Sequence, residues 1–153
     1  MMDGKHKGEP EPRRVRVFFY GTFMSPEVLA RYGINVENVT AARVHNLDIY
    51  IRPRVNLISK NGASVYGGVV SVTHEELDRI YKGLEKQFGL SYLPDAVLAE
   101  PIETTAESEP VLCFITAQME PGAPDPEYVR ELATCVRALN LPESYALQIE
   151  SFN

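Results

Sequence analysis

The sequence predicts an α+β domain whose antiparallel or mixed sheet curls, or closes into a small barrel, with flanking helices. Two observations lead to this prediction. About five or six extended apolar segments are joined mainly by short turns or short helices, without the regular strand–helix alternation of a parallel sheet. Residues 129–139 instead place apolar side chains at helical spacing, and this stripe should pack on the sheet.

Length and composition are those of an ordinary globular chain. At 153 residues, of which 44% are hydrophobic and 24% charged, the chain should form one domain with a proper core. A formal net charge of -6 argues against binding to nucleic acid or to an anionic membrane, because both need a basic face. A small anionic ligand is still compatible, since local N–H groups can bind one inside an acidic protein.

Residues 1–14 are polar, charged and proline-containing, so we expect a disordered tail before a domain over residues 15–153. The tail lacks the apolar segment of a signal peptide, and no apolar run approaches the length of a membrane span. We therefore expect a cytoplasmic protein without a membrane partner. The sequence does not indicate an oligomeric state.

The cysteines and histidines predict no metal site. Cys113 and Cys135 lie in apolar contexts, which favours free buried thiols in a reducing cytosol; a disulfide between them is the less favoured alternative. His6, His45 and His74 are scattered, and none stands at a metal-ligand spacing from a cysteine or carboxylate.

Residues 15–27 predict a strand that runs into a turn and then a helix. The strand, rich in Val, Phe and Tyr, breaks at Gly21. Ser25 is a good N-cap for the helix, and Pro26 suits its first turn. Such a connection points several backbone N–H groups at one spot, which suits a carboxylate, a phosphate or a developing oxyanion. An ordinary strand-to-helix connection is the alternative interpretation.

The next segments predict a short helix and a long strand. The helix should cover residues 26–32 and end at Gly33, a natural residue after a helix. A strand follows over residues 41–51. Arg52-Pro53-Arg54 interrupts it, and the proline suggests a sheet edge or a bulge.

A hairpin is predicted for residues 55–72. Residues 60–63 contain Asn-Gly, which suits a type I′ turn between strands over residues 55–59 and 64–72. The pair Gly67-Gly68 in the second strand indicates a bulge or a close backbone approach.

A capping box opens the next predicted helix, with Thr73 as N-cap and Glu76 reaching back. Apolar residues continue at helical spacing as far as Leu84, and a loop should cover residues 86–94. The remaining elements are listed in chain order: strands over residues 96–102 and 111–117, a helix capped by Asp125, and a short helix or turn over residues 141–149.

Carboxylates are the remaining candidates for chemistry, because the sequence contains no nucleophile elbow, P-loop or dinucleotide-binding fingerprint. Glu75, Glu76 and Asp78 lie in the first turn of the predicted helix, where carboxylates simply favour the helix dipole. Glu85 lies near the other end of that helix, beside partly apolar sequence. Desolvation there would raise its pKa and make it a candidate general base; a solvent-facing glutamate is the alternative.

The segment Phe19-Tyr20-Gly21-Thr22-Phe23 resembles the opening signature of the γ-glutamylcyclotransferase-like (AIG2-like) family, a strand that ends in Tyr-Gly-Ser or Tyr-Gly-Thr. Residues 61–70 resemble the family's second hallmark, a turn followed by Val-x-Gly and an apolar strand. Glu85, with Tyr92 seven residues later, resembles the family's catalytic glutamate and loop tyrosine. Tyr128 and residues 141–145 resemble its closing segment.

The chain also departs from the family pattern. Lys86 stands where a glycine often follows the catalytic glutamate, and Phe23 replaces a common leucine. Residues 52–57 are more basic than in a typical member.

The resemblance implies an enzyme that closes the α-amine of a γ-glutamyl compound onto its γ-carbonyl, which gives 5-oxoproline and releases an amine. It implies Glu85 as the base that shuttles the proton, and no metal or organic cofactor. The substrate-binding residues it suggests are Tyr20, Gly21, Thr22, Phe23, Arg52 and Tyr92.

Two other functions are compatible with the sequence. One is a non-catalytic domain that keeps the cavity and binds a metabolite or protein, which Lys86 favours. The other is an acyl transferase or amide hydrolase with the same base. We further expect that either Arg52 or Arg54 faces the cavity and attracts an anionic group, while the other is exposed.

Overall fold

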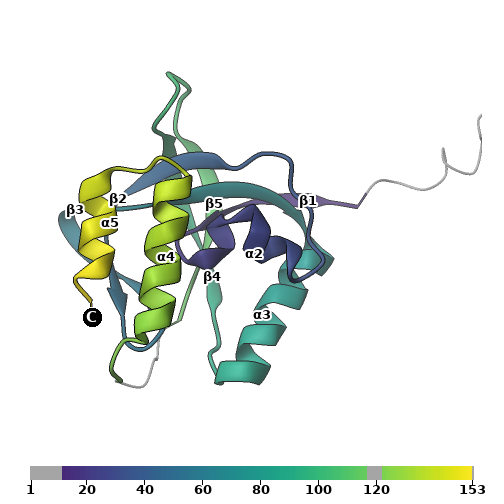
Figure 1. The fold of residues 1–153 in the computed structure, drawn as a ribbon. Helices are drawn as coiled ribbons and strands as arrows, with labels where there is room; N and C mark the ends of the chain where they lie inside the picture. Colours follow the sequence, from purple (N-terminus) through teal and green to yellow (C-terminus); the bar gives the residue numbers. More distant parts are fainter. Residues whose placement is uncertain (1–11, 117–121, 153) are drawn as a thin grey trace, which may run out of the picture.

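Five strands close into a barrel in the computed structural model, which describes residues 12–116 and 122–152 (Figure 1). The strands are β1 (Arg14–Phe19), β2 (Thr40–Ile51), β3 (Val55–Thr73), β4 (Leu93–Pro101) and β5 (Glu109–Ile115). Their order is β1-β3-β2-β4-β5; a parallel pairing of β1 with β5 closes the barrel, and every other pairing is antiparallel. The predicted barrel-like α+β fold is confirmed.

The long strand β3 organises the barrel because it pairs with two neighbours. Its C-terminal part lies against β1, where Phe19 pairs with Gly68, and most of its length lies against β2. The predicted close approach at the Gly67-Gly68 pair is confirmed, since a Cβ atom on Gly67 would overlap the carbonyl oxygen of Phe19. Apolar side chains from all five strands fill the barrel core.

The predicted hairpin turn at residues 60–63 is wrong. These residues lie inside β3 and form a bulge opposite Asn46, where the pairing shifts from Leu47–Ser59 to His45–Ser64. Asn46 and Gly62 have positive φ angles of 67° and 84°, and the Gly62 N–H donates to Asn46 Oδ1 at 3.2 Å. Asn-Gly satisfies the local backbone demands of a turn and of a bulge alike, so the pairing with β2 decides between them.

The hairpin turn instead lies at Arg52-Pro53-Arg54, which the sequence suggested as an edge or a bulge. Ile51 pairs with Val55 directly across this turn, and the Arg52 N–H donates to the Arg54 carbonyl at 2.9 Å. The peptide bond between Arg52 and Pro53 is cis. This turn sends the chain back along β2 and sets the position of Arg54.

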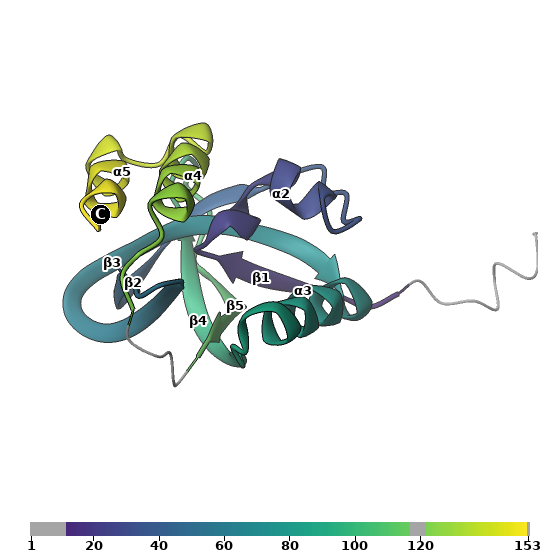
Figure 2. The ribbon, with the colours of Figure 1, turned by 60° about the horizontal axis from the view of Figure 1, so that its bottom comes forward.

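Helices lie on two sides of the barrel, with α2, α4 and α5 on one side and α3 on the other (Figure 2). They are α2 (Pro26–Ala30), α3 (His74–Phe88), α4 (Pro126–Ala138) and α5 (Glu143–Glu150), with a short 3-10 helix η1 (Thr22–Met24) after β1. The predicted apolar stripe of α4 is buried, with Val129, Leu132 and Val136 fully inaccessible. None of the described helices is long and apolar enough to cross a membrane.

Two helix ends differ from the prediction. α2 ends at Ala30, and two turn residues separate it from Gly33, whose φ is 75°. α3 continues through residues 86–88 and ends at Gly89, which adopts the left-handed conformation. The loop before β4 is therefore shorter than predicted.

The capping box of α3 is confirmed, and it gives a stability prediction. Thr73 Oγ1 accepts from the Glu76 N–H at 3.1 Å, and Glu76 Oε1 accepts from the Thr73 N–H at 2.8 Å. Thr73→Ala should lower the free energy of unfolding by about 1 kcal/mol in urea denaturation, because the Glu76 N–H at the helix start loses its acceptor. Thr73→Ser keeps the hydroxyl and should stay near the wild type; equal stability of all three proteins would contradict the prediction.

Cys113 and Cys135 are free and buried, as predicted. Burial raises the pKa of the Cys113 thiol to about 12, so a nucleophilic role is not favoured.

Most of the predicted tail lies outside the described residues, which begin at residue 12, and Arg14 already belongs to β1.

Candidate functional site

A small aromatic cavity lies where the end of β1 meets the turn after it, the start of β3, and helices α3 and α4. Its free volume is about 40 Å³, enough for a few water molecules. Arg54 is its one charged lining residue, and no carboxylate lines it among the residues that the structure describes. The aromatic lining residues are Phe18, Phe19, Tyr20, Phe23, Tyr81, Tyr92, Phe114 and Tyr128.

The Tyr-Gly-Thr turn forms one wall of this cavity, as the sequence suggested. Gly21 has an extended backbone with φ of -106°, which any residue can adopt, so glycine is favoured here by space and not by its conformation. A Cβ atom on Gly21 would lie 3.0 Å from Val55 Cγ1 and 3.1 Å from the Tyr128 hydroxyl oxygen. The backbone N–H of Thr22 is directed at that same hydroxyl. The Tyr128 phenol therefore lies against the backbone group that was expected to hold an anion.

Two cavity tyrosines are fixed by hydrogen bonds to strand carbonyls. Tyr20 donates to the Phe114 carbonyl on β5, and Tyr92 donates to the Val55 carbonyl on β3 at 2.9 Å. Burial raises the pKa of Tyr20 well above its usual value and that of Tyr92 to about 12. Both phenols are therefore neutral at physiological pH and act as hydrogen-bonding groups.

Tyr81 lines the cavity from α3, together with Leu84. Its ring stacks on Phe114 with 4.2 Å between the ring centroids, and it also approaches the Tyr92 ring at 5.8 Å. Within residues 12–116 and 122–152, no group hydrogen-bonds the Tyr81 hydroxyl. Burial raises the pKa of this hydroxyl well above its usual value. Tyr81 thus offers a neutral polar group to a ligand.

Arg54 lies between two aromatic rings at the edge of the cavity. Its guanidinium carbon is 4.2 Å from the centroid of Phe88, at the end of α3, and 4.2 Å from that of Tyr128, at the start of α4. The described part of the chain offers it no carboxylate partner. The charge of Arg54 opposes the effect of burial on the pKa of both Tyr92 and Tyr128. Its positive charge therefore acts on the cavity.

The structure brings together most of the predicted binding residues. Tyr20, Gly21, Thr22, Phe23 and Tyr92 all line the cavity.

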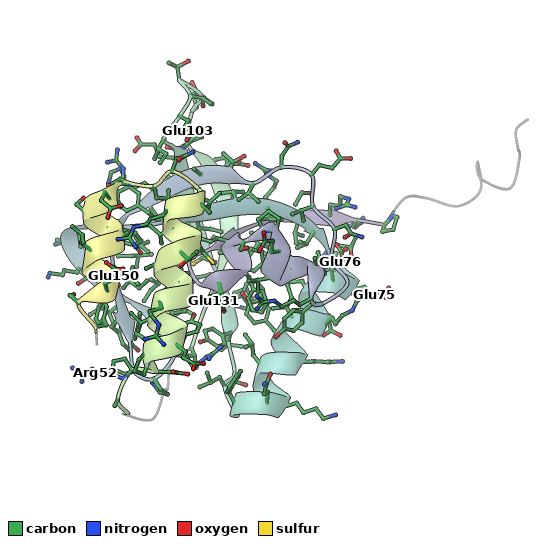
Figure 3. The ribbon with its side chains drawn as sticks, in the orientation of Figure 1. Arg52, Glu75, Glu76, Glu103, Glu131 and Glu150 are labelled. Atoms are coloured by element: carbon green, nitrogen blue, oxygen red, sulfur yellow. The ribbon has the colours of Figure 1, made fainter. Side chains whose placement is uncertain are left out.

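The arginine that lines the cavity is Arg54 and not Arg52, which the sequence suggested. Arg52 is exposed at the hairpin turn, at the margin of the molecule in Figure 3, and it does not line the cavity; Arg54 does. The expectation that one of these two arginines faces the cavity is confirmed in its geometry. The tight turn gives the two side chains different directions, which the sequence does not reveal.

Glu85 does not line the cavity. Its side chain is exposed, and its Oε2 accepts a hydrogen bond from Ser91 Oγ at 3.0 Å. The desolvated surroundings suggested by the sequence are absent, because α3 extends beyond the barrel over residues 85–88. Tyr81 precedes Glu85 by one helical turn and takes the cavity position. Tyr81 was not among the predicted site residues, although its i, i+4 spacing from Glu85 places it on the same helix face.

The carboxylates at the start of α3 have structural roles, as expected (Figure 3). Glu76 completes the capping box, while Glu75 pairs with Arg79 at 3.6 Å and Asp78 pairs with Lys82 at 3.1 Å. Over the described ranges, no group of three or more histidine, cysteine or acidic side chains could hold a metal ion.

A model of the family described as gamma-glutamyl cyclotransferase, AIG2-like, matches residues 17–115, which is more than half of the chain. The matched range contains the second half of β1, all of β2 to β5, α3 and every cavity residue named above except Tyr128. A comparison with curated proteins found no match.

Several solved structures share the fold at low sequence identity. A human protein described as uncharacterized superposes with a TM-score of 0.78 and 14% identity, over 92% of this chain and 88% of its own. A protein named gamma-glutamyl cyclotransferase gives a TM-score of 0.76 and 14% identity, over 92% of this chain and 89% of its own. A yeast gamma-glutamyl cyclotransferase specific to glutathione gives 0.59 and 9%, over 91% and 95%. At these identities the likeness shows the fold alone.

Proposed function

Because the chain belongs to the gamma-glutamyl cyclotransferase, AIG2-like family, we propose that it uses the family cavity to bind a small carboxylate compound without cyclising it. The observation that carries this proposal is the charge of the cavity lining. The lining offers Arg54 and phenols, and its described residues include no carboxylate. Such a set can bind an anion but lacks a base of ordinary strength.

The cyclisation reaction demands more than this set provides. The α-ammonium group of a γ-glutamyl compound must lose a proton before its nitrogen can attack the γ-carbonyl. A general base for that proton must come within hydrogen-bond reach of the nitrogen. The phenols of Tyr20, Tyr81 and Tyr92 are poor bases at neutral pH, because burial keeps them protonated. This favours binding over catalysis.

A second candidate function is γ-glutamylcyclotransferase activity with Glu85 as the base. Two observations favour it: Leu84, the residue before Glu85, lines the cavity, and Ser91 orients the Glu85 carboxylate. Catalytic contacts are often long before the substrate binds, so this candidate needs an experiment.

An assay for 5-oxoproline release separates the two candidates. The wild type and Glu85→Gln are incubated with γ-glutamyl amides and dipeptides, and 5-oxoproline and free glutamate are quantified. We expect no release by either protein, and the same calorimetric affinity of both for a small carboxylate such as 5-oxoproline, since Glu85 lies outside the cavity.

Release of 5-oxoproline by the wild type, reduced by about 10²–10⁴-fold in Glu85→Gln, would establish the second candidate and overturn the first. Release of free glutamate instead would identify an amide hydrolase.

A cytoplasmic setting is part of the proposal, since both described cysteines are free thiols.

A further inference from the structure

The polar groups that face the cavity would treat the two charged ends of an amino acid differently. Arg54 lacks a carboxylate partner within the described residues, and its planar guanidinium can bind a carboxylate through two parallel hydrogen bonds. An ammonium group would find no opposite charge among the described lining residues. It would also lie close to the positive charge of Arg54.

We propose that the cavity selects small carboxylic acids without a charged nitrogen, such as lactam or N-acyl acids, over zwitterionic amino acids. This inference rests on the proposed function and names the class of ligand that the same cavity takes. The ligand property that decides binding is the charge of its nitrogen.

The physical reason is the cost of burying an unpaired charge. A carboxylate that meets Arg54 is compensated, whereas an ammonium group buried among aromatic rings loses its hydration and gains no ion pair. Aromatic faces can attract a cation, but the positive charge of Arg54, which lines the same cavity, opposes a second cation there. A neutral lactam avoids this cost.

The Tyr81 hydroxyl supplies the partner for a neutral polar group. It lies in the cavity lining, and no described group hydrogen-bonds it. A phenol can donate to a lactam or amide carbonyl oxygen. Arg54 and Tyr81 therefore recognise the carboxylate and the neutral polar group of one ligand.

Ligand size and the position of Arg54 are linked. A free volume of about 40 Å³ is too small for an organic acid while Arg54 lies between Phe88 and Tyr128. Binding thus requires the guanidinium to leave this position, which frees its N–H groups for the incoming carboxylate.

Three acids with the same five-membered ring test the proposal by calorimetry on the full chain at pH 7. They are 5-oxoproline, whose nitrogen is a neutral lactam, cyclopentanecarboxylate, which has no nitrogen, and proline, whose nitrogen is charged. We expect 5-oxoproline and cyclopentanecarboxylate to bind at least about tenfold more tightly than proline. Equal or tighter binding of proline overturns the inference and leaves the proposed function standing. Binding of none of the three overturns both.

A matched variant tests the role of Tyr81. Tyr81→Phe keeps the ring that stacks on Phe114 and removes the hydroxyl. It should weaken 5-oxoproline by about threefold to tenfold, the value of one neutral hydrogen bond, and leave cyclopentanecarboxylate unchanged. Unchanged binding of both acids, or an equal loss for both, would show that the hydroxyl does not recognise the lactam. A thermal melt of the variant reports whether the fold is intact.

Discussion

Arg54→Gln should weaken the binding of 5-oxoproline to the cavity by about tenfold to a hundredfold. A hydrogen bond to a charged group contributes about 1.5–3 kcal/mol, and the guanidinium is the one charged group among the described lining residues. Glutamine keeps part of the side-chain length and can still donate from its amide, but it carries no charge. Isothermal titration at low and high salt measures the effect. The difference in affinity between the wild type and Arg54→Gln should shrink at high salt, because salt screens the charge of Arg54.

Arg52→Gln is the matched control, because it makes the same change two residues away. Arg52 is exposed and does not line the cavity, so its variant should bind as the wild type does. If the two variants bind equally well, Arg54 does not hold the ligand carboxylate. If Arg52→Gln alone loses affinity, Arg52 and not Arg54 holds the ligand carboxylate.

Gly67→Ala should lower the free energy of unfolding by about 3 kcal/mol, at the upper end of the range for overpacked sites. Gly67 lies in β3, where a Cβ atom would overlap the carbonyl oxygen of Phe19 and come within 3.1 Å of the Phe18 ring. A backbone oxygen cannot rotate away as a side chain can. The barrel would therefore have to move β1 away from β3, beside the Tyr20 wall of the cavity. Urea denaturation followed by circular dichroism measures this loss.

Gly83→Ala is the control for this change. Gly83 lies in α3, and its nearest neighbour, the Tyr32 ring, would be 3.8 Å from the added Cβ atom, an ordinary contact. Alanine favours a helix interior over glycine by about 0.5–1 kcal/mol, so this variant should be slightly more stable than the wild type. A Gly67→Ala protein as stable as Gly83→Ala would contradict the packing argument.

Several elements could be predicted because short stretches of sequence determine them. The capping box at Thr73 and Glu76 needs only residues three apart, and both of its hydrogen bonds are present. The N-cap at Ser25 and the apolar stripe of α4 are equally local. The strand that ends in Tyr20-Gly21-Thr22 was recognisable for the same reason, and with it one wall of the cavity.

Local sequence could not tell the bulge in β3 from a hairpin turn. Asn61-Gly62 allows either, and the prediction of a hairpin there failed because residues 60–63 bulge out of a continuous β3. The strand reverses at Arg52-Pro53-Arg54 instead, where Ile51 pairs with Val55 across the turn. Pairing between strands distant in sequence makes that choice, and a local pattern does not contain it.

The sequence by itself determined the barrel-like class, the family and the wall of the cavity built from the Tyr-Gly-Thr turn. Only the tertiary structure decided that Arg54 and Tyr81 face the cavity while Arg52 and Glu85 do not. Both choices depend on where an element ends relative to the barrel: the turn orients two nearby arginines differently, and the last turn of α3 extends into solvent. Spacing along the chain gives the face of a helix or strand. What lies opposite that face depends on how the other elements pack.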